Sequence, residues 1–346
     1  MRVLQAMAGS THGGAENFFI RLVTALSMTG IDQRVIIRRN AERMEQLRAH
    51  GIDPLELRFG GMWDIFSKRR FAQAIKEFQP SLVCTWMNRA TAACPHKTSG
   101  YPFIHIGRLG GYYDLKYYRQ CNYLVGNTHH IVDYVVRHGW PKDRVHYLPN
   151  FVDSVPGRTI PRSQFDLPPE GTILLVLGRL HPNKAIDIAI EALTDLPDHY
   201  LLIAGEGPLQ SQLIRQTQDL KIQDRVRFLG WRSDSADLIA TCDIFLCPSR
   251  HEPLGNVVLE AFAQGTPVVA AASSGPSALI TDKKNGLLFP VDNVSALTQC
   301  IKSLGQSRDF RDSLANSGYQ TYNTQFSKEI VLQQWLDFFT SLTTKV

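Results

Sequence analysis

The sequence predicts an α/β protein of two domains, each built around a mainly parallel β-sheet. Three observations support this expectation. Short apolar strands alternate with amphipathic helical patterns in both halves of the 346 residues. A turn-rich stretch without hydrophobic periodicity, residues 149–171, separates the halves. Glycine-rich or polar loops follow several strands, at the edge where open parallel sheets bind ligands.

The first half begins with a strand at 3–7 and an amphipathic helix at 15–28. Phe18, Phe19 and Leu22 lie on the apolar side of that helix, at the spacing of a buried helical face. Further strands are expected at 33–37, 55–57, 82–85, 103–106, 123–125 and 145–147, and helices at 42–49, 64–78 and 128–138.

The second half repeats this alternation after the turn-rich stretch. Its strands are expected at 173–177, near 200–204, 225–229, 243–247, 267–270 and 287–289, and its last helices at 293–304, 308–323 and 328–342. Two such series predict two Rossmann-like domains, and ligands bind such sheets beyond the carboxyl ends of the strands.

The composition is that of an ordinary globular protein, with 44% hydrophobic and 20% charged residues. No run of about eighteen apolar residues suggests a membrane span. The first residues, 1–7, resemble a buried strand more than a secretory signal. Six cysteines without a C-x-x-C pair predict buried free thiols in a reducing cytosol, with neither disulfides nor a cysteine-bound metal.

Charge is unevenly divided along the chain. Residues 1–155 carry 20 Lys and Arg against 12 Asp and Glu, a net charge of +8, whereas residues 156–346 carry 17 against 20, a net charge of −3. A basic first half suggests an anionic partner for it. Three kinds of partner carry the required negative charge: nucleic acid, a membrane surface and a phosphorylated acceptor.

Two carboxylates, Glu252 and Glu260, are separated by seven residues. A turn, residues 253–256, and an apolar helical run lie between them. A helix start after a turn offers backbone N–H groups and the positive end of the helix dipole to an anion. Glu252 precedes that anion site and Glu260 lies about 6–8 Å further along the helix. The two carboxylates can therefore bind hydroxyls on opposite sides of a diphosphate.

This segment resembles the E-x7-E motif of retaining glycosyltransferases of family 4, which have the GT-B fold. The resemblance extends to its flanks, where strands are expected at 243–247 and 268–270 and Gly265-Thr266-Pro267 precedes the second strand. It implies that two Rossmann-like parallel-sheet domains face a central cleft. It also implies an acceptor-side domain at 1–155, a nucleotide-sugar domain at 156–327, and a terminal helix, about 328–346, that packs back on the first domain.

Residues 178–184 follow the first strand of the second half. Arg179 can bind phosphate oxygens with its forked guanidinium, and Lys184 can add a mobile charge. The segment, which begins at Gly178, resembles the family pattern G-R-L-x-x-x-K-G. Ala185 stands where the family has the last glycine. The other interpretation is two surface cations that solvate a loop.

Gly13 and Gly14 lie in the loop after the first strand, just before a helix. Glycines allow a ligand to approach the backbone closely, and the loop resembles the Gly-Gly-x-Glu segment of family 4, which implies a place near the phosphates and the acceptor hydroxyl. Glu16 is an acceptor candidate or a charge in the first helical turn. A plain turn with a helix cap is the alternative. The glycine spacing does not match the dinucleotide-binding fingerprint.

Two further strand ends resemble family segments. Trp231 and Arg232 follow the strand at 225–229, where the family binds the nucleobase, although a buried aromatic residue at a strand end explains Trp231 equally well. Arg108 lies just after the strand at 103–106 and is a candidate contact for the donor sugar or an acidic acceptor. His105 is expected to be a hydrogen-bonded core residue.

The resemblance therefore assigns three catalytic residues, Arg179, Lys184 and Glu252. The expected acceptor contacts are Glu16 and Arg108. The expected donor-binding residues are Gly13, Gly14, Gly178, Arg179, Lys184, Trp231, Arg232, Glu252, Leu254, Gly255, Asn256, Val257 and Glu260. No D-x-D triplet is present, so we expect cations and helix N-termini to hold the diphosphate without a metal or other cofactor.

The predicted helix at 64–78 contains Lys68-Arg69-Arg70 beside several large apolar residues. A cationic amphipathic helix can lie on an anionic membrane surface. A surface helix that packs its apolar stripe inward is the other interpretation.

The sequence thus predicts a retaining, metal-independent hexosyltransferase. It would move a hexose from a UDP- or GDP-linked sugar to a saccharide or lipid-linked acceptor, in cell-envelope polysaccharide or lipopolysaccharide core synthesis. We expect it in the cytoplasm, with attachment to the inner face of the cytoplasmic membrane as an option, and without a nucleic-acid partner. The alternatives are a nucleotide-sugar epimerase of the same fold, a phosphorylase, for which no lysine site for pyridoxal is visible, or a non-catalytic scaffold. The glycine spacing disfavours an NAD oxidoreductase.

Overall fold

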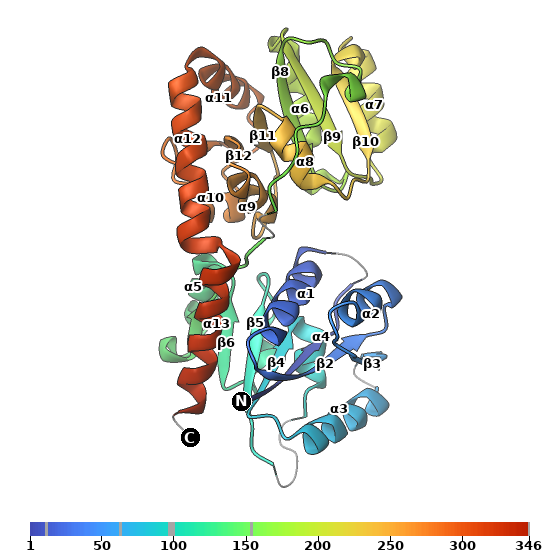
Figure 1. Cartoon of the computed structure of the whole chain (residues 1–346), viewed down its shortest axis with the longest axis vertical. Coiled ribbons are helices and arrows are strands. Elements are labelled where there is room, and N and C mark those ends of the chain that lie inside the picture. Colours follow the sequence, from blue (N-terminus) through green and yellow to red (C-terminus); the bar gives the residue numbers. More distant parts are fainter. Residues whose placement is uncertain (11–12, 62–63, 96–100, 153–154, 345–346) are drawn as a thin grey trace. The chain divides into compact units, whose positions relative to one another are not determined.

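A computed structural model describes the chain except for residues 11–12, 62–63, 96–100, 153–154 and 345–346. The described chain forms two compact units (Figure 1). Unit 1 contains Met1–Asn150 and Lys328–Val346, and unit 2 contains Phe151–Ser327. Both are α/β units with a parallel sheet, so the predicted fold class is confirmed.

Unit 1 contains a seven-stranded sheet in the order β3-β2-β1-β4-β5-β6-β7, with every described pair parallel. Its strands are β1 (Arg2–Met7), β2 (Asp32–Arg38), β3 (Leu55–Leu57), β4 (Leu82–Trp86), β5 (Ile104–Leu109), β6 (Tyr123–Gly126) and β7 (Val145–Tyr147). Its helices are α1 (Gly14–Ser27), α2 (Ala41–Arg48), α3 (Ile65–Phe78), α4 (Met87–Ala93), α5 (His129–Arg137) and α13 (Lys328–Thr343).

Unit 2 contains a six-stranded parallel sheet in the order β10-β9-β8-β11-β12-β13. Its strands are β8 (Thr172–Leu177), β9 (His199–Ala204), β10 (Val226–Gly230), β11 (Ile244–Cys247), β12 (Val268–Ala271) and β13 (Leu287–Phe289). Its helices are α6 (Ile186–Ala192), α7 (Gln210–Asp219), α8 (Ser235–Thr241), α9 (Asn256–Ala263), α10 (Ser274–Leu279), α11 (Val294–Gln306) and α12 (Arg308–Thr321).

Both sheets have the strand order of a doubly wound fold. The chain first adds strands on one side of the starting strand and then returns to add strands on the other. The reversal lies between β1 and β4 in unit 1 and between β8 and β11 in unit 2. In doubly wound folds the loops that leave such neighbouring strands diverge to opposite faces, and ligands commonly bind at that point.

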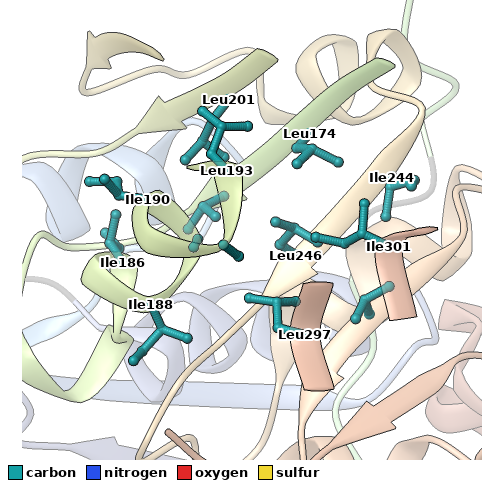
Figure 2. Packing of buried hydrophobic residues seen from close by; sticks show 14 of the residues in the cluster. Leu174, Ile186, Ile188, Ile190, Leu193, Leu201, Ile244, Leu246, Leu297 and Ile301 are labelled. Atoms are coloured by element: carbon teal, nitrogen blue, oxygen red, sulfur yellow. The ribbon is translucent and has the colours of Figure 1, made fainter. Parts of the chain in front are cut away.

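Alternating side chains of β8 supply both faces of the unit 2 core. Leu174 packs with α6 and α11 on one face, which Figure 2 shows, whereas Ile173 and Leu175 pack with α8 and α9 on the other. Because both faces are covered, the strand is an almost continuous apolar run and not an alternating one. This rigid layer fixes the loops that follow β8 and β11.

The division between the units falls after Asn150, five residues before the predicted boundary at 155. The reason is that Phe151 and Val152 are both buried. The carbonyl of Val152 also accepts a hydrogen bond of 2.9 Å from the Tyr322 hydroxyl, which belongs to unit 2.

The terminal helix α13 belongs to unit 1, as its red ribbon beside β6 illustrates (Figure 1). Trp335 is fully buried and stacks on Trp86 of β4, with ring centroids 6.3 Å apart. Phe338 lies against His146 of β7 at 4.6 Å. Val331, Phe338 and Phe339 of this helix are also buried, whereas Ile330 is 39% exposed.

Helices α4 and α10 are among those whose ranges were not predicted from the sequence. The segment of α4 follows β4 without a loop, and α10 begins in a Ser-Gly-Pro segment that resembles a turn. Both have only six or seven residues, too few for a periodic pattern to appear. None of the described helices is long and apolar enough to cross a lipid bilayer.

Replacement of Trp335 by Ala should lower the stability of unit 1 by about 3–5 kcal/mol, because it removes a large buried ring from a packed interface. Differential scanning calorimetry should show the transition of unit 1 at a temperature lower by roughly 10 °C, with that of unit 2 unchanged. Thr340→Ala, on the exposed face of the same helix, is the control. An unchanged unit 1 transition in Trp335→Ala would contradict this role of α13.

Candidate functional site

The loop after β8 runs from Gly178 to Ala185. Its ends are held by backbone bonds, from Gly178 N to Ala204 O at 3.0 Å and from Lys184 N to His181 O at 2.9 Å. Ala185 is fully buried and adopts the left-handed conformation, with φ of 49°. The alanine therefore adopts a backbone conformation that favours glycine, at a cost of about 1 kcal/mol.

Lys184 and Glu252 form an ion pair that joins the loop after β8 to the loop after β11. Lys184 Nζ donates to Glu252 Oε2, and the two side chains are only 26% and 12% exposed. Burial by itself would lower the pKa of Lys184, but the charge and the hydrogen bond of Glu252 outweigh it and raise that pKa above its usual value. Lys184 is therefore a fixed cation, and its remaining N–H groups can bind another anion.

Arg179 lies beside this pair and is exposed. Within the part of the chain that the structure describes, its guanidinium has no hydrogen-bonded or ionic partner. Its charge acts on Lys184 and opposes the protonation of that lysine. An anion that binds both cations relieves this repulsion, so the pair favours a group with two or more negative charges.

The turn after Glu252 is constrained by tight backbone packing. Gly255 adopts φ of 83°, and its N–H donates to Glu252 Oε1 at 3.3 Å. The carbonyl of Glu252 accepts from Gly275 N at 2.7 Å, and a Cβ atom at Gly275 would lie 2.6 Å from the carbonyl carbon of Leu254. Glycine at 275 is thus required for the turn that directs the Glu252 carboxylate toward Lys184.

Helix α9 begins immediately after this turn, at Asn256. Gly255 precedes it and offers no side chain to cap it, so its first N–H groups suit an anion. Glu260 follows Asn256 by four residues, about one helical turn, and is half-buried. The structure therefore has the order of groups expected from the sequence, with a carboxylate before the helix start and another one turn inside.

The ends of β9 and β10 lie two and three strands from β11. Trp231, directly after β10, is 71% exposed, and its backbone N–H donates to Glu206 Oε1 at 3.4 Å. An exposed indole is available to stack on a flat ring, whereas a core role for Trp231 is excluded by this exposure. Arg232 instead forms a two-point ion pair with Asp234, at 2.8 and 2.5 Å.

Arg250 supports the loop from Gly178 to Ala185, a role that was not predicted from the sequence. Its guanidinium donates to both carboxylate oxygens of Asp187, at 3.0 and 2.6 Å, to Asp292 at 2.5 Å and to the carbonyl of Pro182 at 2.9 Å. It thereby fastens the loop before Lys184 to the loop that carries Glu252. Its partners lie 63 and 42 residues away in the sequence, so no local pattern could identify them.

In unit 1, Glu16 is buried and holds the loop in front of α1. Its Oε1 atom accepts from the backbone N–H of Ser10 at 2.6 Å and from the Ser10 hydroxyl at 3.0 Å. Arg43 donates to the Ser10 carbonyl at 2.8 Å. The carboxylate thus holds Ser10, which follows β1, and a contact between Glu16 and an acceptor stays a prediction.

Arg108 has no exposed surface. Its guanidinium lies over the rings of Trp86 at 4.5 Å and Phe18 at 5.0 Å, and donates to Asn150 Oδ1. Burial lowers the pKa of Arg108 to about 10, so it stays cationic at neutral pH. Cation–π contacts compensate part of the cost of this buried charge. The predicted contact with a sugar or an acidic acceptor is untested. His105 is the expected core residue, with Nε2 2.8 Å from Thr85 Oγ1.

Both units match known protein families. Residues 12–155 match the profile of Glycosyltransferase Family 4, and residues 158–321 match that of Glycosyl transferases group 1. The chain is 32% identical over 336 residues to the lipopolysaccharide core biosynthesis glycosyltransferase LpsE of Rhizobium meliloti, covering 95% of this chain and 96% of LpsE. The chain belongs to glycosyltransferase family 4.

A second relative of this family 4 glycosyltransferase is LpsD of the same organism, which bears the same description. It is 31% identical over 342 residues, with 98% of each chain covered. The crystal structure of HepE from Anabaena in complex with UDP has a TM-score of 0.88 at 20% identity, covering 99% of this chain and 100% of HepE. That likeness establishes the GT-B fold. HepE has also been solved with UDP-glucose.

The predicted site residues of this glycosyltransferase fall into two groups. One group lies in unit 2, at the carboxyl ends of β8, β10 and β11 and in α9. It contains Gly178, Arg179, Lys184, Trp231, Arg232, Glu252, Leu254, Gly255, Asn256, Val257 and Glu260. The other group lies in unit 1 and contains Gly13, Gly14, Glu16 and Arg108.

Arg250→Met should loosen the segment around Lys184, because it removes one hydrogen bond to Pro182, two to Asp187 and one to Asp292. Hydrogen exchange followed by mass spectrometry should show faster exchange at residues 181–187. The exposed Arg215→Met, with the same change of charge, should leave that segment unchanged. Equal exchange in both variants would show that Arg250 does not position the loop.

Proposed function

We propose that the chain is a retaining, metal-independent hexosyltransferase that uses a nucleotide diphosphate-sugar in the synthesis of a lipopolysaccharide core. The observation that carries this proposal is the cluster of Arg179, Lys184 and Glu252 at the reversal of strand order in unit 2. It combines two cations with a carboxylate that is already oriented.

The proposed chemistry is stabilisation of a leaving diphosphate. As the glycosidic bond breaks, negative charge grows on the phosphate oxygen that leaves. Lys184 and the N–H groups at the start of α9 are held in place before the reaction, so they stabilise this charge without reorganisation, and the exposed Arg179 adds a second positive charge. The hydrogen bond to Lys184 occupies one carboxylate oxygen of Glu252, and the carboxylate retains lone pairs for a sugar hydroxyl.

No side chain in this cluster is placed as a nucleophile, so we propose attack on the same face that the diphosphate leaves. The departing phosphate oxygen then takes the proton of the acceptor hydroxyl. Glu260 would bind the ribose, and Trp231 would stack on the base. A donor with UDP is the first to test, since HepE has been solved with UDP and with UDP-glucose. The core polysaccharide assignment is supported by LpsE and LpsD.

UDP at about 100 times its dissociation constant should stabilise the protein by roughly 2.7 kcal/mol, measured as a shift of the unfolding transition of unit 2. Arg179→Ala and Lys184→Met should each remove most of this shift, because each deletes a cation from the diphosphate site. Lys302→Met, which removes an exposed charge from α11, is the matched control. Stabilisation by UDP that persists in Arg179→Ala would disprove the phosphate assignment, and stabilisation by NAD alone would favour an oxidoreductase.

The same protein preparations test metal independence and the retaining mechanism. Transfer or slow hydrolysis of the sugar should continue in EDTA, and proton NMR of the first product should show the anomeric configuration of the donor. Loss of activity in EDTA that Mg²⁺ restores would contradict metal independence. An inverted first product would contradict the retaining mechanism.

We also propose that α3 attaches unit 1 to an anionic membrane surface. The helix packs Phe71 and Ile75 inward, as an ordinary surface helix does, yet Ile65 and Phe66 in its first turn are 59% and 65% exposed. The basic run 68–70 follows directly. Exposed apolar side chains beside cations suit an interface with anionic lipid headgroups.

The double variant Ile65→Ser/Phe66→Ser should bind anionic lipid vesicles less tightly, because about 25 cal/mol of transfer free energy is lost for each Å² of apolar surface no longer buried. Co-sedimentation with phosphatidylglycerol vesicles and with neutral phosphatidylcholine vesicles measures this. Tyr319→Ser removes a comparably exposed ring from α12 and is the control. Equal binding by the double variant and the control would argue against attachment through α3.

A further inference from the structure

A pocket of about 740 Å³ lies within unit 1, at the carboxyl edge of its sheet. Its walls come from the segments that follow five strands, β1 to β5. Four basic residues line it, one from each of four different segments. They are Arg38 at the end of β2, Lys68 in the first turn of α3, Arg89 in α4, and Lys116 in the turn after β5. Segments that are distant in sequence thus bring their cations to one cavity.

The charges around this pocket do not cancel. Lys116 is paired with Asp114 at 2.6 Å. Asp64 is the one carboxylate in the lining, and it accepts from the backbone N–H groups of Ser67 at 2.9 Å and Gly60 at 2.7 Å. Arg38 and Arg89 have no acidic partner among the residues that the structure describes.

The surrounding unit adds to this potential. Unit 1 holds 22 Lys and Arg against 13 Asp and Glu, a net charge of +9, whereas unit 2 holds 15 against 19, a net charge of −4. A cavity wall of low dielectric constant concentrates such a field, which raises the local concentration of anions.

The pocket wall also contains an unsatisfied polar atom and a strained residue. The side-chain oxygen of Asn88 is buried and has no hydrogen-bond partner in the described chain. Met87 adopts the left-handed conformation, with φ of 64°, which is costly for a residue with a long side chain. Tyr113 and Tyr117 add hydroxyls and ring faces. Polar groups that surround a cavity of this volume suit a sugar-sized ligand.

We infer that this pocket binds an acceptor sugar that carries an anionic substituent, a phosphate or a carboxylate, and that Arg38 and Arg89 hold that group. The inference rests on the proposed function, since it assigns the acceptor class of the same glycosyltransferase. The forked guanidinium groups bind either oxyanion through two parallel hydrogen bonds. Asn88 and the two tyrosines are then the contacts for the neutral hydroxyls of the sugar.

Titration with small sugars in the presence of saturating UDP tests this inference. UDP occupies the cations of unit 2, so that a sugar phosphate cannot bind there instead. The probes are glucose 6-phosphate, glucuronic acid and neutral glucose, and protein NMR or calorimetry measures their dissociation constants. We expect at least one anionic sugar to bind about tenfold more tightly than glucose, because a charge-assisted pair contributes about 1.4 kcal/mol or more.

Arg38→Gln/Arg89→Gln should reduce the affinity for the anionic sugar to that for glucose, whereas Arg69→Gln, an exposed cation outside the pocket, should not. Arg38→Lys/Arg89→Lys should keep part of the preference, because the charge remains and only the fork is lost. A preference for one of the two anionic sugars identifies the substituent as phosphate or carboxylate.

Several outcomes would overturn the inference. They are equal binding of charged and neutral sugars, a preference that survives Arg38→Gln/Arg89→Gln, no measurable sugar binding, or inorganic phosphate that binds as tightly as glucose 6-phosphate. In each of these cases UDP binding still reports on the proposed function. Absence of UDP binding itself would count against the proposed function, independently of the sugar result.

Discussion

The ion pair between Lys184 and Glu252 is the contact on which the candidate site depends. It joins the loops after β8 and β11, the two neighbouring strands at which the order of the unit 2 sheet reverses. Glu252 keeps the half-buried ammonium charged, and the ammonium orients the carboxylate. Neither group is stable at this depth alone, because an unpaired buried charge costs several kcal/mol. The pair therefore sets a cation and an oriented acceptor side by side before any ligand binds.

Around this pair, the conformation of the backbone positions the side chains of the candidate site. Gly275 lets the start of α10 approach the turn after Glu252, and Ala185 accepts a strained conformation so that Lys184 can turn inward. Arg250 holds the outer side of the same loop through two aspartates and a carbonyl. These contacts explain why a site of exposed loops has a defined geometry. Lys184 and Glu252 are held in place by these neighbouring residues.

Unit 1 contains a buried positive charge, that of Arg108. Arg108 is buried with no carboxylate partner among the described residues, and the rings of Trp86 and Phe18 supply the compensating contacts. Trp86 also stacks on Trp335, so the same indole links the charge to the terminal helix. Four other cations of unit 1, Arg38, Lys68, Arg89 and Lys116, line the pocket at the carboxyl edge of the sheet. The unit thus combines aromatic packing around Trp86 with positive charges at the carboxyl edge of its sheet. These charges agree with the excess of basic residues in the first half of the sequence.

The sequence by itself determined the α/β class, the order of most strands and helices, and the family, because apolar runs, turn residues and the spacing of Glu252 and Glu260 are local properties. The tertiary structure determined the features that depend on long-range contacts. It showed that Arg232 is engaged by Asp234, that Glu16 supports a loop, and that Arg38 and Arg89 line one pocket. It also gave Arg250 its partners and moved the unit boundary to Asn150. These facts depend on residues tens of positions apart, which only the packed sheets bring together.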